Sequence, residues 1–221
     1  GGLASRALSG TPQTHAVLGF PIAGLAGAFA PAVVAATLLG DGMSSPLMDE
    51  LRERRGLVYY AACSADVLES AGQFVIEAST SPQRLDEFFE HTVRLLLAQA
   101  DQVNASQLER ARRQLIVRHL RRQDQPAQRL ETAALDLFAT GRVRRSDEQL
   151  AALQAVGADQ AREAFAHMLQ AGAAIAVAGK LPRAAGERLR SLAGPILRAE
   201  AAATQPAPVR RRHFGARGVR G

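Results

Sequence analysis

Two side chains in the stretch LRERRGLVYY could bind one ligand together. Arg52 and Tyr59 lie seven residues apart, on either side of Gly56. A guanidinium offers a planar fork of N–H donors and a phenol offers one O–H donor, so the pair could hold a single carbonyl or carboxylate oxygen. By itself the spacing favours a simpler alternative, in which Arg52 faces solvent and Tyr59 packs within a sheet.

The elements around this pair are predicted to be a short helix, a turn and a strand. A serine just before Pro46 can cap the helix, and the proline fits its first turn, where a missing N–H costs nothing. Gly56 tolerates the left-handed backbone needed to end the helix and reverse the chain. Alternation along the strand then places four residues on one face: Leu57, Tyr59, Ala61 and Cys63. We therefore expect Arg52 and Tyr59 at the same end of the sheet.

No metal site is expected within this chain. The histidines are His15, His91, His119, His167 and His213. None lies three or four residues from another, and neither H-E-x-x-H nor H-x-x-E-H occurs, the motifs that place two histidines on one helix face for zinc. Glu90-His91 falls in the middle of an amphipathic helix, where we expect the solvated edge of that helix.

Other catalytic patterns are also missing from the sequence. Gly40-Asp41-Gly42 lacks the third glycine of a dinucleotide-binding loop, and no G-x-S-x-G motif occurs. The single cysteine, Cys63, excludes an internal disulfide, and we expect a small buried residue rather than a nucleophile. Arg52 and Tyr59 are therefore the candidate site.

The formal net charge of +6 lies mostly in the C-terminal segment. Residues 201–221 hold five arginines and no acidic residue, which leaves +1 for the first 200 residues. We expect residues 200–221 to be a disordered basic tail, and non-specific, salt-sensitive nucleic-acid binding by it is one alternative function. The helix after Asn104 is also rich in arginine, which we expect to be the solvated side opposite an apolar face of Leu108, Ala111, Leu115 and Leu120.

The most apolar window, Ala23–Leu39, contains Pro31 and falls short of the roughly 20 residues that span a membrane. We expect a buried helix there and no membrane partner. No basic segment followed by an apolar core marks a signal peptide, so bacterial cytoplasm and periplasm both stay open as the compartment. The sequence starts at Gly1 rather than Met, which favours a processed or truncated chain whose residues 1–13 are the end of a linker.

The expected elements follow an order typical of an α+β protein. Short apolar strands are predicted at His15–Phe20, Leu57–Val67, Gln73–Ser79 and Ala173–Ala178. The middle two are close enough in sequence to form an antiparallel hairpin. From Ser81 the hydrophobic period changes from 2 to 3.6, which predicts a group of helices before the last strand. We predict a mixed, largely antiparallel sheet covered on one face by helices, with the last strand near its centre.

The stretch LLGDGMSSPLMDELRERRGLVYY resembles LGGGMSSRLFxELREKRGLAY, found in the zinc-free half of pitrilysin/insulinase-type metallopeptidases, the inverzincins. This family includes the mitochondrial processing peptidase and its two-subunit bacterial relatives. The likeness covers roughly Gln13 to Leu197, because the predicted strands and helices follow the family's order. It implies a single domain of the C-terminal type over residues 14–199, with the fold of one half of such a peptidase.

In that family two homologous halves enclose a chamber, one binding zinc through H-x-x-E-H and the other supplying an arginine–tyrosine pair. The family's arginine falls on Arg52 and its tyrosine on Tyr59. The resemblance implies that the two residues orient the peptide backbone and stabilise the tetrahedral oxyanion. No cofactor is expected in this chain, and zinc is expected in the partner half. The implied partners are that half, as in a heterodimer, and a peptide substrate, and we do not expect the chain to cleave peptides alone.

The resemblance leaves two kinds of alternative open. The chain could be a separate non-catalytic subunit or the C-terminal half of one two-half protein, and the start at Gly1 favours the second. It could also be a structural subunit of the same fold, like the core subunits of a respiratory complex. Three positions depart from the family's motif: Asp41 replaces a glycine, Pro46 a polar or basic residue, and Tyr60 a serine. They leave the Arg52–Tyr59 pair intact and the substrate preference open.

Overall fold

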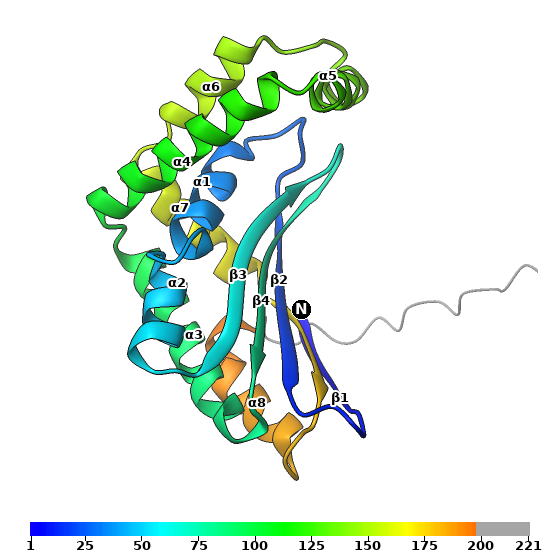
Figure 1. Cartoon of the computed structure of the whole chain (residues 1–221), viewed down its shortest axis with the longest axis vertical. Coiled ribbons are helices and arrows are strands. Elements are labelled where there is room, and N and C mark those ends of the chain that lie inside the picture. Colours follow the sequence, from blue (N-terminus) through cyan, green and yellow to red (C-terminus); the bar gives the residue numbers. More distant parts are fainter. Residues whose placement is uncertain (198–221) are drawn as a thin grey trace, which may run out of the picture.

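The computed structural model describes residues 1–197, which contain one five-stranded sheet (Figure 1). The strands are β1 (Gly2–Ala7), β2 (Thr14–Ile22), β3 (Val58–Val67), β4 (Gly72–Thr80) and β5 (Ala174–Gly179). Their order is β1-β5-β2-β4-β3, and every neighbouring pair is antiparallel except β1 with β5. The predicted mixed, largely antiparallel sheet is confirmed, and β3 and β4 form the predicted hairpin.

The first strand departs from the expectation for the N-terminal residues. We expected residues 1–13 to be a linker end, but Gly2–Ala7 pairs in parallel with Ala174–Gly179 as the edge strand β1. Because a strand's preference depends mainly on the neighbours it packs against, a small polar segment carries little local signal for such pairing. β1 also encloses β5, so the strand predicted near the centre is an internal one.

The described helices lie on one face of the sheet, as Figure 1 shows. They are α1 (Ala30–Gly40), α2 (Pro46–Met48), α3 (Leu85–Asp101), α4 (Ala105–Gln123), α5 (Pro126–Thr140), α6 (Ser146–Gln154), α7 (Ala158–Ala171) and α8 (Ala185–Ala193), with a π-helix η1 (Asp49–Arg54) and the 3-10 turns η2 (Pro82–Arg84) and η3 (Gly194–Ile196). Along β2, Ala16, Leu18 and Phe20 are buried, whereas His15 and Val17 are exposed on the other face. This alternation is the one expected of a sheet with a single covered face.

Helix α1 begins at Ala30, later than the predicted start at Ala23. The residues before it cross the end of the β3–β4 hairpin, where the Leu25 N–H donates to the Leu68 carbonyl at 2.8 Å. Gly24 lies so close to that hairpin that a Cβ would be 2.6 Å from the Ala71 nitrogen. Tertiary contact with the hairpin therefore holds this segment out of the helix, which starts where Pro31 fits its first turn.

The core joins the sheet to the helices through aromatic and aliphatic side chains. Phe74 on β4 packs edge to face with Phe20 on β2 and with Phe165 on α7, at centroid distances of 6.2 and 6.0 Å. Cys63 on β3 is buried as predicted, and its burial raises the pKa of the thiol well above the ordinary value. A thiol in that state is a poor nucleophile.

The apolar face of α4 is shorter than predicted. Leu108, Ala111 and Leu115 are buried, but Leu120 is 51% exposed. Leu120 follows Leu115 by five residues, which turns it about 140° away around the helix. The opposite face is also less solvated than expected, because Arg112 donates through Nε to the Val156 carbonyl at 2.9 Å.

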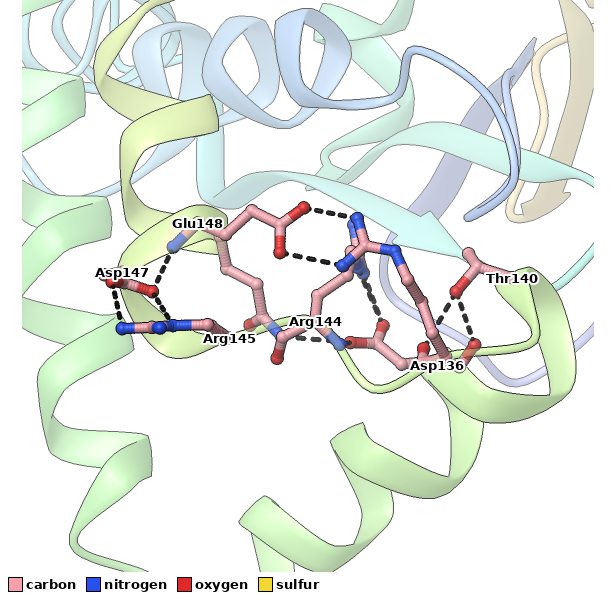
Figure 2. A network of polar contacts seen from close by, with 8 residues as sticks. Asp136, Thr140, Arg144, Arg145, Asp147 and Glu148 are labelled. Carbon is pink, nitrogen blue, oxygen red and sulfur yellow. Dashed lines mark hydrogen bonds and ion pairs between the residues drawn. The ribbon is translucent and has the colours of Figure 1, made fainter.

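Helix α5 is held by a polar network, drawn in Figure 2. Asp136 is its one buried residue, and its carboxylate accepts from the Arg144 backbone N–H at 3.1 Å and from Gln149 at 3.0 Å. The Arg144 guanidinium pairs with the same carboxylate and lies over the Phe29 ring, 5.3 Å from its centroid. The network ties α5 and α6 to the segment before α1.

Residues 198–221 are not described by the structure, so the predicted basic tail at residues 200–221 lies outside it. Among residues 1–197, no helix combines the length and apolar character needed to cross a membrane.

Candidate functional site

Arg52 is presented by a π-helix, a rare backbone form often found at functional sites. Helix α2 begins after Ser45, whose hydroxyl accepts from the Met48 N–H at 3.4 Å, and continues directly into η1. Leu51 is fully buried, whereas the next side chain, Arg52, is 41% exposed. Its Nη1 lies 3.6 Å from the Met43 sulfur. The wide turn thus anchors its apolar side in the core and leaves the guanidinium accessible.

A closed turn at Gly56 joins this helix to β3. The Gly56 N–H donates to the Arg52 carbonyl at 2.9 Å, and the Leu57 N–H donates to the Leu51 carbonyl at 2.7 Å. Gly56 has φ +58°, in the left-handed region that the sequence predicted for it. The last turn of η1 and the first residue of β3 are therefore adjacent.

Arg84, which directly precedes α3, binds this turn through hydrogen bonds. Its Nη1 donates to the carbonyls of Arg55 at 2.9 Å and Gly56 at 2.8 Å. On the inner side, the Thr80 hydroxyl donates to the Leu57 carbonyl at 2.6 Å. Three carbonyls in a row are thus bound by side chains from β4 and η2. Nothing in the local sequence indicated Arg84, because it lies 28 residues beyond Gly56.

Tyr59 occupies a bulge in β3. Val58 pairs with Thr80 and Tyr60 pairs with Ser79, so Tyr59 is an extra residue without a partner on β4. Its side chain is 80% exposed. The prediction that it shares a face with Ala61 and Cys63 is wrong, because a bulge breaks the alternation and re-aims the side chain. The alternative in which Tyr59 packs within the sheet is excluded as well.

Arg52 and Tyr59 therefore lie at the two ends of one rigid connection, and both are exposed. Within residues 1–197 the Tyr59 hydroxyl has no hydrogen-bond partner, and no hydrogen bond joins it to the Arg52 guanidinium. Arg52 contacts the Glu53 carboxylate through Nε at 3.7 Å and the Met43 sulfur through Nη1 at 3.6 Å. The Tyr59 hydroxyl and the remaining Arg52 donors are thus available to a ligand. The types of donor match a carbonyl or carboxylate oxygen.

A charged cluster supports η1 from behind. The Glu50 carboxylate accepts from Arg55 Nε at 2.7 Å and lies 3.1 Å from His91 Nδ1. The hydrogen bond from Arg55, aided by its charge and that of His91, lowers the pKa of Glu50 despite partial burial. His91 is buried against η1, so its predicted place on a solvated edge is wrong. Sequence periodicity alone did not reveal which element would cover α3 there.

The loop after α1 is fixed by close packing and by arginines of α4. A Cβ at Gly40 would lie 2.2 Å from the Cβ of Cys63, so α1 approaches β3 as only glycine allows. Gly42 has φ +82°. Arg110 donates to the carbonyls of Leu38 and Asp41 at 2.9 Å each, and desolvation lowers its pKa. This loop carries Met43 toward Arg52.

The residues present do not fit a zinc site. Among residues 1–197, no group of three or more His, Cys, Asp or Glu side chains is arranged to hold a metal ion. The nearest arrangement in the candidate site, Glu50 with His91, is completed by the guanidinium of Arg55, and a cation at that position repels a metal.

The chain matches proteins described as zinc proteases. It is 27% identical over 150 residues to an uncharacterized zinc protease of Rickettsia felis, a match that covers 66% of this chain and 36% of that protein. A second, from Rickettsia bellii, is 34% identical over 80 residues, covering 36% of this chain and 19% of that protein. The chain therefore spans only part of the length of these curated relatives.

Solved structures share the fold at low identity. A chain of Complex III2 from Candida albicans, bound to Inz-5, matches with TM-score 0.76 and 14% identity, over 87% of this chain and 49% of that chain. A peptidase M16 inactive domain from Pseudomonas fluorescens matches with TM-score 0.69 and 18% identity, over 82% and 44%. A protease from Helicobacter pylori matches with TM-score 0.68 and 14% identity, over 80% and 43%.

The family model "Peptidase M16 inactive domain" matches residues 3–115, just over half of the 221 residues. That range includes the loop after α1, the π-helix and the bulge. The predicted resemblance is thereby confirmed: this chain belongs to the family of M16 peptidase inactive domains.

Proposed function

We propose that this chain is the substrate-binding, zinc-free half of a zinc metalloendopeptidase, working in a chamber formed with an H-x-x-E-H half. The observation that carries the proposal is the presentation of Arg52 and Tyr59. A π-helix, which is a rare backbone form, and a β-bulge expose the two side chains at either end of one hydrogen-bonded turn. Packing of the hydrophobic core does not require either of these two side chains to be exposed.

The proposed role follows from the donors and from the hydrogen-bonded turn that separates them. The Arg52 fork and the Tyr59 hydroxyl would donate to a carbonyl oxygen of the peptide backbone and hold it in one orientation. Donors that are fixed before the reaction stabilise an oxygen most as it gains negative charge. The zinc chemistry would belong to the partner half, since the described residues of this chain offer no fitting ligand set.

Reconstitution tests this proposal. The chain would be mixed with a homologous H-x-x-E-H half, and cleavage of an internally quenched peptide would be followed. We expect no turnover from either half alone and turnover from the mixture. Arg52→Ala and Tyr59→Phe should each lower kcat by about a hundredfold, as loss of an oxyanion donor does, while size-exclusion chromatography shows unchanged assembly.

Two neighbouring residues of the same types provide matched controls. Arg54 is exposed and pairs with Asp49 at 2.8 Å, and Tyr60 follows the bulge with 52% exposure. Arg54→Ala and Tyr60→Phe should change kcat by less than about threefold. Full activity of the Arg52→Ala and Tyr59→Phe enzymes would refute the proposed role.

A structural subunit is the second candidate, because one similar fold belongs to a respiratory complex. A zinc-bearing half encoded beside this chain would support the protease, whereas assembly with homologous halves that never yields cleavage would support the scaffold. Nucleic-acid binding by the tail is third. It would require a salt-dependent gel shift that disappears when residues 201–221 are deleted.

A further inference from the structure

A basic groove runs along α4 toward the first turn of α5. The two helices lie in the upper part of Figure 1. The groove is an open hollow of about 580 Å³. Four arginines line it, together with one carboxylate: Arg113, Arg118, Arg121, Arg122 and Asp41. Arg118, Arg121 and Arg122 lie beyond residues 3–115, the range that matches the family model.

The charge of this groove is only partly balanced within the described residues. Arg113 donates to Glu109 at 2.9 Å, and Arg118 pairs with Asp41. Arg121 and Arg122 are exposed, and neither forms an ion pair with any of residues 1–197. The groove therefore presents two unmatched guanidinium forks. Such forks bind planar carboxylates through two parallel hydrogen bonds, with a geometry that a lysine cannot offer.

The groove begins at the loop after α1, which also contacts the proposed peptide-binding site. Asp41 forms one end of it, and Met43, two residues later, contacts Arg52 through its sulfur at 3.6 Å. Two residues of chain span at most about 7 Å. The loop is held in place, since Arg110 binds the Asp41 carbonyl and Arg118 binds its carboxylate. An extended peptide bound at Arg52 could thus continue onto α4.

We propose that this groove binds acidic side chains of the peptide substrate, and so selects peptides with Asp or Glu to one side of the residue held by Arg52 and Tyr59. The inference rests on the proposed function. It also rests on the composition of the groove, whose lining contains no aromatic side chain on which nucleotide bases could stack. Carboxylates therefore match the groove better than single-stranded nucleic acid does.

Binding to this chain alone tests the groove without the zinc half. The probe is a fluorescein-labelled peptide of alternating Glu and Gly, compared with the same peptide carrying Gln at each Glu, in fluorescence anisotropy at low salt. We expect the Glu peptide to bind more tightly than the Gln peptide. Arg121→Gln with Arg122→Gln should weaken the Glu peptide by about fivefold. Lys at both positions should give an intermediate affinity, because it keeps the charge and loses the fork.

Arg183→Gln with Arg190→Gln is the matched control, since both residues are exposed near α8 and the change in net charge is identical. It should leave the affinity for the Glu peptide unchanged. Equal affinity for the Glu and Gln peptides, or for the chain with and without the Arg121/Arg122 substitutions, would overturn the proposal. A thymidine oligonucleotide that binds more tightly than the Glu peptide, through the same two arginines, would assign the groove to nucleic acid instead.

The assembled enzyme separates failure of the groove from failure of the proposed function. The Arg121→Gln, Arg122→Gln enzyme should show a raised KM and an unchanged kcat for peptides with Glu, and unchanged constants for peptides with Gln. If the substitutions weaken assembly instead, the groove is an interface between the halves and the proposal falls. If Arg52→Ala abolishes turnover but the Arg121→Gln, Arg122→Gln enzyme keeps its KM for peptides with Glu, the proposed function stands and the groove proposal is rejected. If Arg52→Ala keeps full turnover while the groove substitutions raise KM, the groove binds acidic peptides but the role proposed for Arg52 is rejected.

Discussion

The Arg84 guanidinium donates to the carbonyl of Gly56 at 2.8 Å, across 28 residues of sequence. This one contact, with its companion to the Arg55 carbonyl at 2.9 Å, fixes the turn that separates Arg52 from Tyr59. Arg84 itself faces away from the core and is exposed. Its position is explained by its hydrogen bonds to the turn rather than by packing against the core.

Arg84→Gln should therefore impair the reconstituted enzyme more than it impairs folding. We expect kcat/KM to fall by about tenfold, because small displacements of positioned donors are costly, while the free energy of unfolding falls by only about 1 kcal/mol. Steady-state kinetics and urea unfolding measure the two effects. Arg94→Gln, which removes an exposed pair with Glu90 on the same helix, should affect neither. Equal effects of the two substitutions would contradict a positioning role for Arg84.

Gly40→Ala tests the close approach of α1 to β3. The new Cβ would lie 2.2 Å from the Cβ and 2.7 Å from the backbone nitrogen of Cys63, so the helix or strand must shift. Overpacking of this kind should lower the free energy of unfolding by about 3 kcal/mol in urea titration. Gly2→Ala is the control, because its Cβ would meet nothing within 4 Å, and it should change stability by less than about 0.5 kcal/mol. A stable Gly40→Ala protein would show that the loop after α1 can adjust.

The cluster behind η1 should make stability depend on pH. Glu50 has a lowered pKa, chiefly through the hydrogen bond from Arg55, so its contribution is fully present above the ordinary glutamate value of 4.5. That contribution is lost as pH falls through the lowered pKa. Glu50→Gln should thus be less stable than the unchanged chain at neutral pH, by about 1 kcal/mol, and the difference should vanish in acid. Unfolding titrations at a series of pH values give the comparison, and a difference that grows in acid would disprove it.

Asp136→Ala tests the attachment of α5. Asp136 is 1% exposed and is bound by Arg144 and Gln149, so its loss leaves a largely buried guanidinium without its partner. We expect a loss of about 3 kcal/mol in the free energy of unfolding. Asp147→Ala removes another carboxylate of Figure 2, but one that is 66% exposed in its pair with Arg145, and should lower the free energy of unfolding much less than Asp136→Ala does. Similar losses for both variants would argue against the buried network as the anchor of α5.

The sequence correctly predicted features that depend mainly on nearby residues or on the residue type itself. Gly56 was predicted to adopt a left-handed backbone, and it has φ +58°. The hairpin of β3 and β4 was predicted from β-forming residues on both sides of a short break, and the two strands pair as expected. Cys63 was predicted to be buried because a lone cysteine behaves as a small apolar residue.

Features that depend on distant neighbours were missed. The alternation rule placed Tyr59 on the face of Ala61 and Cys63, since nothing in the strand itself announces a bulge. Residues 1–13 were predicted to be a linker end, because the sequence of β1 does not show that it pairs with β5. His91 was predicted to be solvated, because the sequence of its own helix does not show that η1 packs over it. Each error concerns a residue whose environment is supplied by a segment far away in the chain.

The sequence by itself determined the family and the order of the elements after β1, and it indicated Arg52 and Tyr59 as the candidate pair, because motif and periodicity are properties of neighbouring residues. Only the tertiary structure decided that Tyr59 lies in a bulge of β3 with its side chain exposed, that Arg84 binds the turn between the pair, and that Arg121 and Arg122 line a groove ending at Asp41. The exposure of a side chain, a hydrogen bond between distant residues and a surface groove all depend on how separate segments pack together. They therefore cannot be predicted from neighbouring residues alone.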